Sequence, residues 1–260
     1  MADFSLIIIT WNAKHFLEKC LDSIYNKNKG FEFELVMVDN NSTDGTREFV
    51  ENKYPETVYI YNDSNKGVAP ARNQGLSIAK GKYKLILDVD TELLTENAFA
   101  KLVDFMESNK EVGIIGAKLM FSNDELQHTC LKFPSVGVKV FTRLGVFGGS
   151  KMLREYYMFD FDHNSIKEVD YVIGAFQLLR SQMLEKIGLY DDKIFYGPED
   201  IDYCLRARRA GYKTVYFPEV KLYHFYQRIT KKFFTKITFL HIKGLIHFFL
   251  KHKYIIYPKY

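Results

Sequence analysis

Two carboxylates spaced one residue apart point most directly to chemistry in this sequence. Asp88 ends the apolar run Tyr83–Asp88, and Asp90 follows after Val89. In an extended chain the side chains of residues i and i+2 point the same way, so both acids address one point. Two anions so close repel each other unless a cation or a proton lies between them. The pair suits Mg²⁺ or Mn²⁺, whereas an isolated pair of this kind is more often a solvated turn.

A second pair of acids opens a helical pattern near the end of the chain. Glu199 and Asp200 follow Gly197 and Pro198. A carboxylate in this place could act as a general base that takes a proton from an acceptor hydroxyl. Proline and acids also suit the first turn of a helix for capping and dipole reasons alone, so both interpretations stay open. His224, further on, is a metal ligand or a satisfied surface histidine, and taken alone it favours the latter.

Alternating strands and helices must position these groups. The sequence predicts strands over Ser5–Thr10, Glu34–Asp39, Val58–Tyr61 and Tyr83–Asp88. Helical periodicity begins at Phe16, covers Thr46–Lys53, and begins again near Val68, where Pro70 suits a first turn. Such alternation implies the α/β class, with a mostly parallel, Rossmann-like sheet that carries helices on both faces.

Polar residues gather at one edge of this predicted sheet. The first strand ends at Thr10–Asn12, the second at Asp39–Asn41 and the fourth at Asp88–Asp90. Ligands bind beyond the carboxyl ends of strands in open parallel sheets. Asp39 alone could merely hold a turn, and Trp11 could be a core residue. Their convergence on one edge favours a binding site.

The second half of the sequence is less regular. Residues 122–168 are rich in glycine and aromatic side chains, and their weak periodicity predicts a long loop of functional or mobile character. Regular order returns at Val169–Ile173. Helices are expected over Ser181–Ile187 and Glu199–Gly211, and a strand over Tyr212–Phe217.

Composition bounds the class of protein. The 260 residues suit one large domain or one and a half, and 47% hydrophobic with 26% charged residues is typical of globular proteins. Three scattered cysteines indicate reduced thiols in the cytosol. The apolar run Leu6–Ile9 is too short for a signal peptide, and no run is long enough for a membrane span, so we expect neither secretion nor a transmembrane protein.

The end of the chain has a charge of its own. Nine Lys or Arg and no acids lie from Lys221 onward, while the residues before it carry a net −5. Apolar residues recur at helical spacing among these bases: Phe233, Phe234, Ile237, Leu240, Gly244, Ile246 and Phe248. A basic amphipathic helix within residues 228–260 suits an anionic membrane surface. Packing on the body or in a dimer is the alternative, and the acidic body argues against nucleic acid.

Six segments, in order, resemble the inverting nucleotide-sugar glycosyltransferases of family 2, which have the GT-A fold. They read IIITWN, VDNNSTDGT, NKGVAPARNQG, LILDVD, VDYVIGAFQLLR and YGPEDIDYCLRARRAGYK. The last two, with the continuation HFYQR, look most like the rhamnosyltransferase-type enzymes of bacterial cell-surface polysaccharide synthesis. The resemblance implies a GT-A domain over residues 1–224, followed by a basic amphipathic helical segment over 225–260.

The resemblance also implies roles for single residues. Those that would bind the nucleotide and its diphosphate are Thr10, Trp11, Asn12, Asp39, Asn41, Asn65, Lys66, Gly67 and Arg72, with Asp39 accepting from the imide N–H of a pyrimidine. Asp88 would contact the ribose or the metal's water shell, Asp90 would bind the ion, and His224 would be a further ligand. Gly174 and Ala175 would lie near the sugar. Asp200 would be the base, and Glu199 would orient the acceptor.

The implied activity is a metal-dependent single displacement with inversion. The donor would be dTDP-rhamnose or a UDP-sugar, and the acceptor a hydroxyl of a glycan or of a lipid-linked saccharide at the inner face of the cell membrane. Pro198, directly before the two acids, departs from the familiar pattern, and residues 134–165 match no motif of the family. The oligomeric state, including a homodimer, stays open.

Two other functions remain as alternatives. A sugar-1-phosphate nucleotidyltransferase would need a glycine-rich basic phosphate loop after the first strand, and Trp11–Lys14 does not supply one. A non-catalytic sugar-nucleotide or membrane-binding scaffold would not need Asp88, Asp90 and Asp200. P-loop, dinucleotide-binding and nucleophile-elbow motifs are absent from the sequence.

Overall fold

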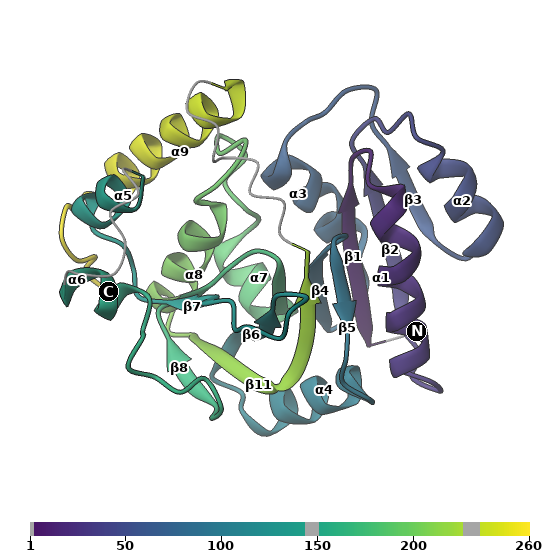
Figure 1. The fold of residues 1–260 in the computed structure, drawn as a ribbon, viewed down its shortest axis with the longest axis horizontal. Coiled ribbons are helices and arrows are strands. Elements are labelled where there is room, and N and C mark those ends of the chain that lie inside the picture. Colours follow the sequence, from purple (N-terminus) through teal and green to yellow (C-terminus); the bar gives the residue numbers. More distant parts are fainter. Residues whose placement is uncertain (1–2, 144–150, 226–234) are drawn as a thin grey trace.

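The computed structural model describes residues 3–143, 151–225 and 235–260 (Figure 1). Its strands are β1 (Phe4–Thr10), β2 (Glu34–Asp39), β3 (Val58–Tyr61), β4 (Tyr83–Asp88), β5 (Thr91–Leu93), β6 (Val112–Met120), β7 (Cys130–Leu131), β8 (Lys167–Val169), β9 (Tyr171–Val172), β10 (Phe176–Arg180) and β11 (Lys213–His224). Its helices are α1 (Lys14–Lys27), α2 (Thr46–Lys53), α3 (Val68–Ile78), α4 (Ala98–Ser108), α5 (Val136–Arg143), α6 (Lys151–Tyr156), α7 (Ser181–Ile187), α8 (Glu199–Arg209) and α9 (Lys236–His252).

One large sheet organises the described residues, with strand order β3-β2-β1-β4-β10-β6-β11-β5 and β8 paired to β11. The first four strands are parallel and lie where the sequence predicts them. Thr10 pairs with Asp39, and Ile9 pairs with Asp88. The polar ends of β1, β2 and β4 therefore share one edge of the sheet, as predicted.

The rest of the sheet is mixed. β10 is antiparallel to both β4 and β6, and β11 is parallel to β6 but antiparallel to β5 and β8. β11 extends to His224, beyond the predicted Tyr212–Phe217, because a register shift between Phe217 and Lys221 accommodates Pro218 within the strand. The α/β class is confirmed, but the β-α-β alternation describes only the first half of the chain.

Helices cover both faces of the sheet because the side chains of each strand alternate between them. Leu6 and Ile8 belong to the core cluster with residues of α1 and α4, whereas Ile7 belongs to the cluster with residues of α3, α7 and α8. Substituting such a buried Ile or Leu with Ala costs about 2–5 kcal/mol of stability. All three cysteines are free and buried within these clusters.

Short elements interrupt the segment 122–168, which the sequence predicts to be a long loop. β7, α5 and α6 lie within it, while residues 144–150 fall outside the described residues. The hydroxyls of Tyr156 and Tyr171 lie 2.6 Å apart, joining α6 to β9. The rings of these two tyrosines also lie 6.5 Å apart, so α6 is held against β9 by both a hydrogen bond and a ring contact.

Helix α9 confirms the predicted helix at the end of the chain but corrects its faces; Phe233 and Phe234 lie outside the described residues. Phe248 is fully buried against the body, whereas Ile246, two residues earlier, is 57% exposed. The apolar residues therefore do not form one stripe but lie on two faces of the helix. No helix in the described part of the chain is both long and apolar enough to span a membrane.

Candidate functional site

Two carboxylates and an imidazole meet at the carboxyl edge of the sheet. One ligand atom from each of Asp88, Asp90 and His224 lies within 4.8 Å of the other two. The long β11 brings His224 there, and the amide of Phe225 donates to the carbonyl of Asp90 at 2.8 Å. Oxygen and imidazole donors of this kind fit a divalent cation such as Mn²⁺.

Gln127 orients the histidine of this cluster, although no pattern in the sequence indicated this residue. Its Nε2 donates to the carbonyl of His224 at 2.7 Å, so its Oε1 faces the ring and lies 2.9 Å from Nδ1. The imidazole therefore donates from Nδ1, which turns Nε2 toward the acids of the cluster. Nε2 lies 3.5 Å from Oδ1 of Asp90.

A buried arginine connects this cluster to the second pair of acids. Arg72 of α3 donates to Oε1 of Glu199 at 3.0 Å, to the carbonyl of Gly174 at 2.9 Å and to Oδ1 of Asp88 at 3.3 Å. Gly174 must lack a side chain, because a Cβ there would lie 2.5 Å from Nη1 of Arg72. The guanidinium thus lies between the cluster of Asp88, Asp90 and His224 and the start of α8.

The two acids of α8 have different surroundings. Oδ2 of Asp200 accepts from the amide of Gly174 at 3.1 Å, and its Oδ1 accepts from the amide of Ile201 at 2.7 Å. Glu199 is buried. Burial and the neighbouring Asp200 raise the pKa of Glu199 above its usual value, although Arg72 opposes the shift. Partial burial likewise raises the pKa of Asp88, whose side chain is 41% exposed, and Arg72 opposes the shift.

Asp39 is fully buried at the end of β2. Tyr59 of β3 donates to its Oδ2 at 2.6 Å, and the amide of Ser42 donates to its Oδ1 at 2.8 Å. Two residues further along each segment, Tyr61 donates to Oδ1 of Asn41 at 2.7 Å. Neither tyrosine was identified from the sequence, because only the pairing of β3 with β2 brings them to this edge.

The loop after β1 is joined to the loop after β2. Asn12 has a left-handed backbone (φ 50°), its amide donates to Oγ of Ser42, and its Oδ1 accepts from the amide of Thr43 at 2.8 Å. Trp11 is 51% exposed, whereas Thr10 is buried. This exposed indole lies beside the polar edge rather than in the core.

The predicted diphosphate loop precedes α3. Gly67 has φ 93°, and a Cβ there would lie 2.7 Å from Phe195, whose carbonyl accepts from the amide of Val68. Oδ1 of Asn65 accepts from the amide of Gly67. Lys66 forms an ion pair with Asp63 at 2.7 Å rather than with the acids of the cluster.

The remaining predicted residue, Ala175, is buried directly before β10. Its carbonyl accepts from the amide of Asp88 at 3.0 Å, which fixes the end of β4 beside β10. The structure thus brings Asp88, Asp90 and His224 together, and Arg72 joins them to Glu199. Among the described residues, the predicted donor residues of the loops after β1 and β2 and before α3 form separate contacts, and Trp11 and Lys66 also lie outside the Arg72 network.

Helix α9 packs on the loop that leads to the two acids of α8. Gly197 has φ 66°, and a Cβ there would lie 2.1 Å from Nδ1 of His241. A Cβ on Gly244 would lie 3.2 Å from Cδ of Pro198, so a glycine in each segment permits this close approach. The end of the chain, predicted as a separate segment, is therefore in contact with the loop that precedes Glu199.

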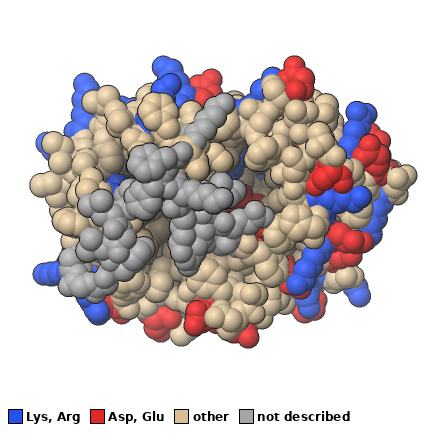
Figure 2. Space-filling model, turned by 45° about the horizontal axis from the view of Figure 1, so that its top comes forward, with Lys and Arg blue, Asp and Glu red and all other residues tan. Residues whose placement is uncertain are grey.

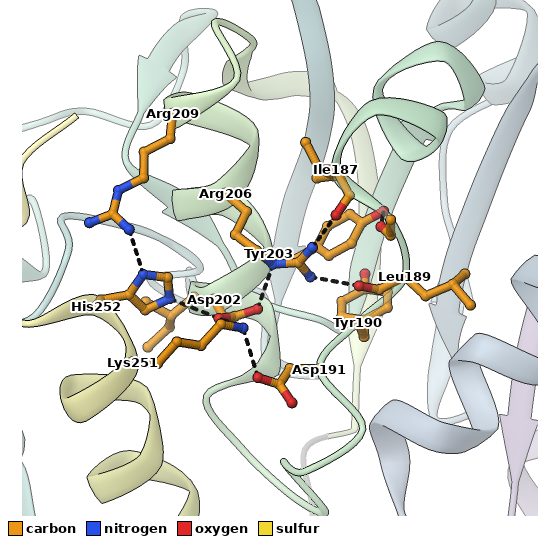
Figure 3. A network of polar contacts seen from close by, with 12 residues as sticks. Ile187, Leu189, Tyr190, Asp191, Asp202, Tyr203, Arg206, Arg209, Lys251 and His252 are labelled. Carbon is orange, nitrogen blue, oxygen red and sulfur yellow. Dashed lines mark hydrogen bonds and ion pairs between the residues drawn. The ribbon is translucent and has the colours of Figure 1, made fainter.

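A buried polar network fixes the other end of α9 (Figure 3). Asp202, fully buried in α8, accepts from Arg206 at 2.8 Å, from Lys251 at 2.7 Å and from His252 at 2.8 Å. Because Arg209 can only donate, Nδ1 of His252 accepts from it, and Nε2 donates to Asp202. Burial alone would raise the pKa of Asp202, but these partners lower it below its usual range.

Lys251 also contacts the loop before α8. Asp191 accepts from Lys251 at 2.7 Å and lies 2.9 Å from Nε2 of His247. Burial raises the pKa of Asp191, but hydrogen bonds from Lys251, His247 and the amide of Lys193 lower it to about 2. The last two turns of α9 are thus bound both to the loop and to α8.

Comparison with known proteins points to one family. The family model described as "Glycosyl transferase family 2" matches residues 5–188, which excludes α8 and His224. A "PGL/p-HBAD biosynthesis glycosyltransferase" of Mycobacterium tuberculosis is 32% identical over 174 residues, covering 62% of this chain and 68% of the relative. "Minor teichoic acid biosynthesis protein GgaB" of Bacillus subtilis is 33% identical over 126 residues, covering 46% of this chain but 14% of its own length.

A solved structure shares the fold. The mannosyltransferase PcManGT from Pyrobaculum calidifontis, in complex with GDP-Man and Mn²⁺, has a TM-score of 0.63 and 19% identity. The match covers 96% of this chain and 63% of that one. At this identity the likeness concerns the arrangement of strands and helices alone.

Proposed function

Because the chain belongs to glycosyl transferase family 2, with the GT-A fold, we propose that it transfers a sugar from a pyrimidine nucleotide donor to a hydroxyl group, with inversion at the anomeric carbon. The observation that supports this most is the position of two groups of acids on opposite sides of one buried arginine. Asp88 and Asp90 lie with His224 on one side, and Glu199 and Asp200 lie on the other. An inverting displacement needs a leaving-group site and a base on opposite sides of one carbon.

The first group is proposed as the site of a divalent cation. Asp90 and His224 would hold the ion directly, and Asp88 directly or through its water shell, since all three ligand atoms lie within 4.8 Å of one another. Mn²⁺ accompanies the sugar nucleotide in the mannosyltransferase structure, and the same ion or Mg²⁺ suits these donors. Bound there, it would neutralise charge that develops on the departing diphosphate.

Asp200 is proposed as the general base and Glu199 as the residue that orients the acceptor. The amide of Gly174 holds one oxygen of Asp200, which sets the direction of its carboxylate. A base so held takes the proton of the acceptor hydroxyl as the oxygen attacks the anomeric carbon, and the carbon–oxygen bond to the diphosphate breaks. Gly174 and Ala175, beside Arg72, would lie against the sugar.

The donor nucleotide is proposed to lie along the edge formed by β1 and β2. The residues assigned to it are Thr10, Trp11, Asn12, Asp39, Asn41, Asn65, Lys66, Gly67 and Arg72. Asp39 would accept from the imide N–H of a pyrimidine. Tyr59 and Ser42 already donate to its two oxygens, so the carboxylate is fixed before a ligand arrives. Our proposed donor is a UDP-sugar or dTDP-rhamnose.

The acceptor is proposed to be a glycan or a lipid-linked saccharide at the cytoplasmic face of the membrane. In support, one relative is named for minor teichoic acid biosynthesis and another as a PGL/p-HBAD biosynthesis glycosyltransferase. In this proposal residues 1–224 perform the transfer and residues 225–260 contact an anionic membrane. The acceptor hydroxyl would approach from the side of α8 and α9.

Ligand-dependent thermal unfolding tests the proposal. The protein is heated with UDP, dTDP, GDP or CMP, each with and without Mn²⁺. A ligand present at 100 times its dissociation constant stabilises by about 2.7 kcal/mol, which shifts the midpoint by a few degrees. We expect a Mn²⁺-dependent shift with UDP or dTDP that Asp90→Asn abolishes. A shift with GDP alone would contradict the pyrimidine assignment, and no shift with any nucleotide would contradict the donor site.

A further inference from the structure

We propose that the outward face of α9 is a docking surface for an anionic lipid bilayer, and that docking brings the acceptor side of the active site to the membrane. This inference rests on the proposed function in one respect, the lipid-linked acceptor. The surface itself follows from the exposure, the anchoring and the charge of α9.

Four large apolar side chains lie exposed on one face of α9. Phe239, Ile242, Ile246 and Leu250, named here the α9 stripe, recur every three or four residues, and Phe239 and Leu250 are 69% and 72% exposed. The exposed residues 255–257, two isoleucines and a tyrosine, follow the helix. A contiguous apolar patch of this kind marks a surface that contacts a partner or a membrane.

The helix is not free to turn this stripe inward. Phe248, on the opposite face, is fully buried. Lys251 and His252 bond to the buried carboxylate of Asp202, and Lys251 also pairs with Asp191 (Figure 3). Rotating α9 would break these bonds and leave the buried carboxylate of Asp202 with Arg206 of α8 as its remaining cationic partner among the described residues, which costs stability. The exposure of the stripe is therefore a fixed property of the folded chain.

Charge selects an anionic lipid surface as the occupant. Lys243 and Lys253, beside the stripe, are exposed, and no acid follows Glu219 in the sequence. Figure 2 shows blue side chains along the margin of the mostly tan upper-left surface. Lysines beside an apolar helix face are attracted to anionic headgroups. A twofold contact between two copies would instead bring the same lysines near each other.

The inward face of α9 connects this surface to the reaction. His241 and Gly244 contact the loop of Gly197 and Pro198, directly before Glu199. The stripe is on the other side of the same helix, so about one helix diameter, roughly 10 Å, separates the docked surface from that loop. A saccharide carried on a membrane lipid could thus reach the proposed base.

Vesicle sedimentation with the full chain tests the inference. We compare vesicles of phosphatidylcholine with vesicles that also contain phosphatidylglycerol, at low and high salt. The wild type should sediment with the anionic vesicles and dissociate as salt increases. The triple variant Phe239→Ser/Ile246→Ser/Leu250→Ser should bind at least tenfold more weakly, and Lys243→Gln should weaken binding on anionic vesicles only. Ile166→Ser, a half-exposed isoleucine outside α9, and Lys101→Gln are the matched controls.

Light scattering and nucleotide binding make each outcome decisive. Equal binding by the triple variant, or no binding by the wild type, would overturn the inference. It would also be overturned if the wild type is a dimer that the triple variant dissociates and neither binds vesicles, since the stripe would then be a self-contact. The triple variant should keep the Mn²⁺-dependent nucleotide shift. If the variant loses vesicle binding but keeps that shift, the α9 stripe is the membrane-binding surface. If the wild type shows no shift, the proposed function is wrong, whatever the result with vesicles.

Discussion

Arg72 and Glu199 form a buried ion pair at 3.0 Å although 127 residues separate them in the sequence. The pair joins α3 to α8, and Asp88 shares the same guanidinium at 3.3 Å. The carboxylates of Asp88 and Glu199 therefore interact electrostatically with the same guanidinium, which couples the two sides of the site. A buried arginine with carboxylate partners loses most when a single member is removed, because the rest remain uncompensated.

Replacing this arginine should destabilise the fold. Arg72→Met leaves Glu199 and Asp88 without their cation, so the free energy of unfolding should fall by about 3–5 kcal/mol. Denaturant titration measures it. Arg47→Met is the matched control, because the ion pair of Arg47 with Glu51 is exposed, and it should have no measurable effect. If the free energy of unfolding falls equally in both variants, the buried ion pair stabilises the fold no more than the exposed one.

Gln127 should tune the affinity for the cation. Gln127→Leu removes the hydrogen bond to Nδ1 of His224, and loss of such an orienting partner typically weakens metal binding about 10–100-fold. Calorimetric titration with Mn²⁺ measures the affinity, with Asp90→Asn as the variant that lacks a proposed ligand. The exposed Gln182→Leu should bind as the wild type does. Unchanged affinity in Gln127→Leu would mean that His224 is not a ligand.

If Asp200 is the general base, its substitution should lower turnover without weakening donor binding. Asp200→Asn keeps the shape of the side chain but cannot take a proton, so kcat should fall about 100–10,000-fold with little change in the KM for the donor. Steady-state assays of sugar transfer measure both constants. Asp192→Asn, on an exposed loop residue nearby, is the control. Turnover near the wild-type rate in Asp200→Asn would remove this residue from the mechanism.

Low pH should weaken the contacts that hold α9 to Asp191 and so lower the stability of the protein. The pKa of Asp191 is lowered in the folded chain, to about 2, so its ion pairs stabilise fully above the unfolded pKa near 4 and are lost as pH falls toward 2. Asp191→Asn should be less stable than the wild type at pH 7, and the gap should narrow below pH 4. Denaturant midpoints measured from pH 7 to pH 3 test this. A gap that is constant with pH would contradict it, and Asp192→Asn should show no gap.

The absence of a side chain at Gly197 should be what allows α9 to pack closely. Gly197→Ala places a methyl group 2.1 Å from His241 in addition to the strain of a positive φ, so it should destabilise more than Gly30→Ala. Gly30 has φ 79° but no neighbour within 4 Å, and its variant measures the strain alone, about 1–2 kcal/mol. Thermal unfolding compares the two. Gly197→Ala/His241→Ala should recover the excess, and no recovery would mean that the contact is unimportant.

The first half of the fold could be predicted because its information is local. Buried parallel strands are continuous apolar runs, so β1, β2 and β4 and their polar ends were evident before any contact was known. The edge that collects Asp39, Asp88 and Asp90 followed from strand direction alone. A resemblance of motifs supplied the roles, and the geometry of the cluster is consistent with them.

The rest depends on contacts between distant segments. Nothing near Gln127 indicates that it faces His224, and Tyr59 reaches Asp39 only through the pairing of β3 with β2. Periodicity found the helix α9 but could not tell Ile246 from Phe248, since both are apolar and only the body decides which one is covered. The sequence analysis also missed β10, which is antiparallel to β4 and β6, because the direction of a strand depends on the strands with which it pairs.

The two faces of α9 have a practical consequence for anyone who purifies the protein. Its apolar outer surface would invite removal of the last residues to improve solubility. That truncation would also remove Lys251 and His252, leaving Asp202 as a charge buried in α8 beside Arg206 alone. Shortening the chain should therefore lower the yield of folded enzyme, while polar substitutions at Phe239 and Leu250 should raise solubility and keep the body intact.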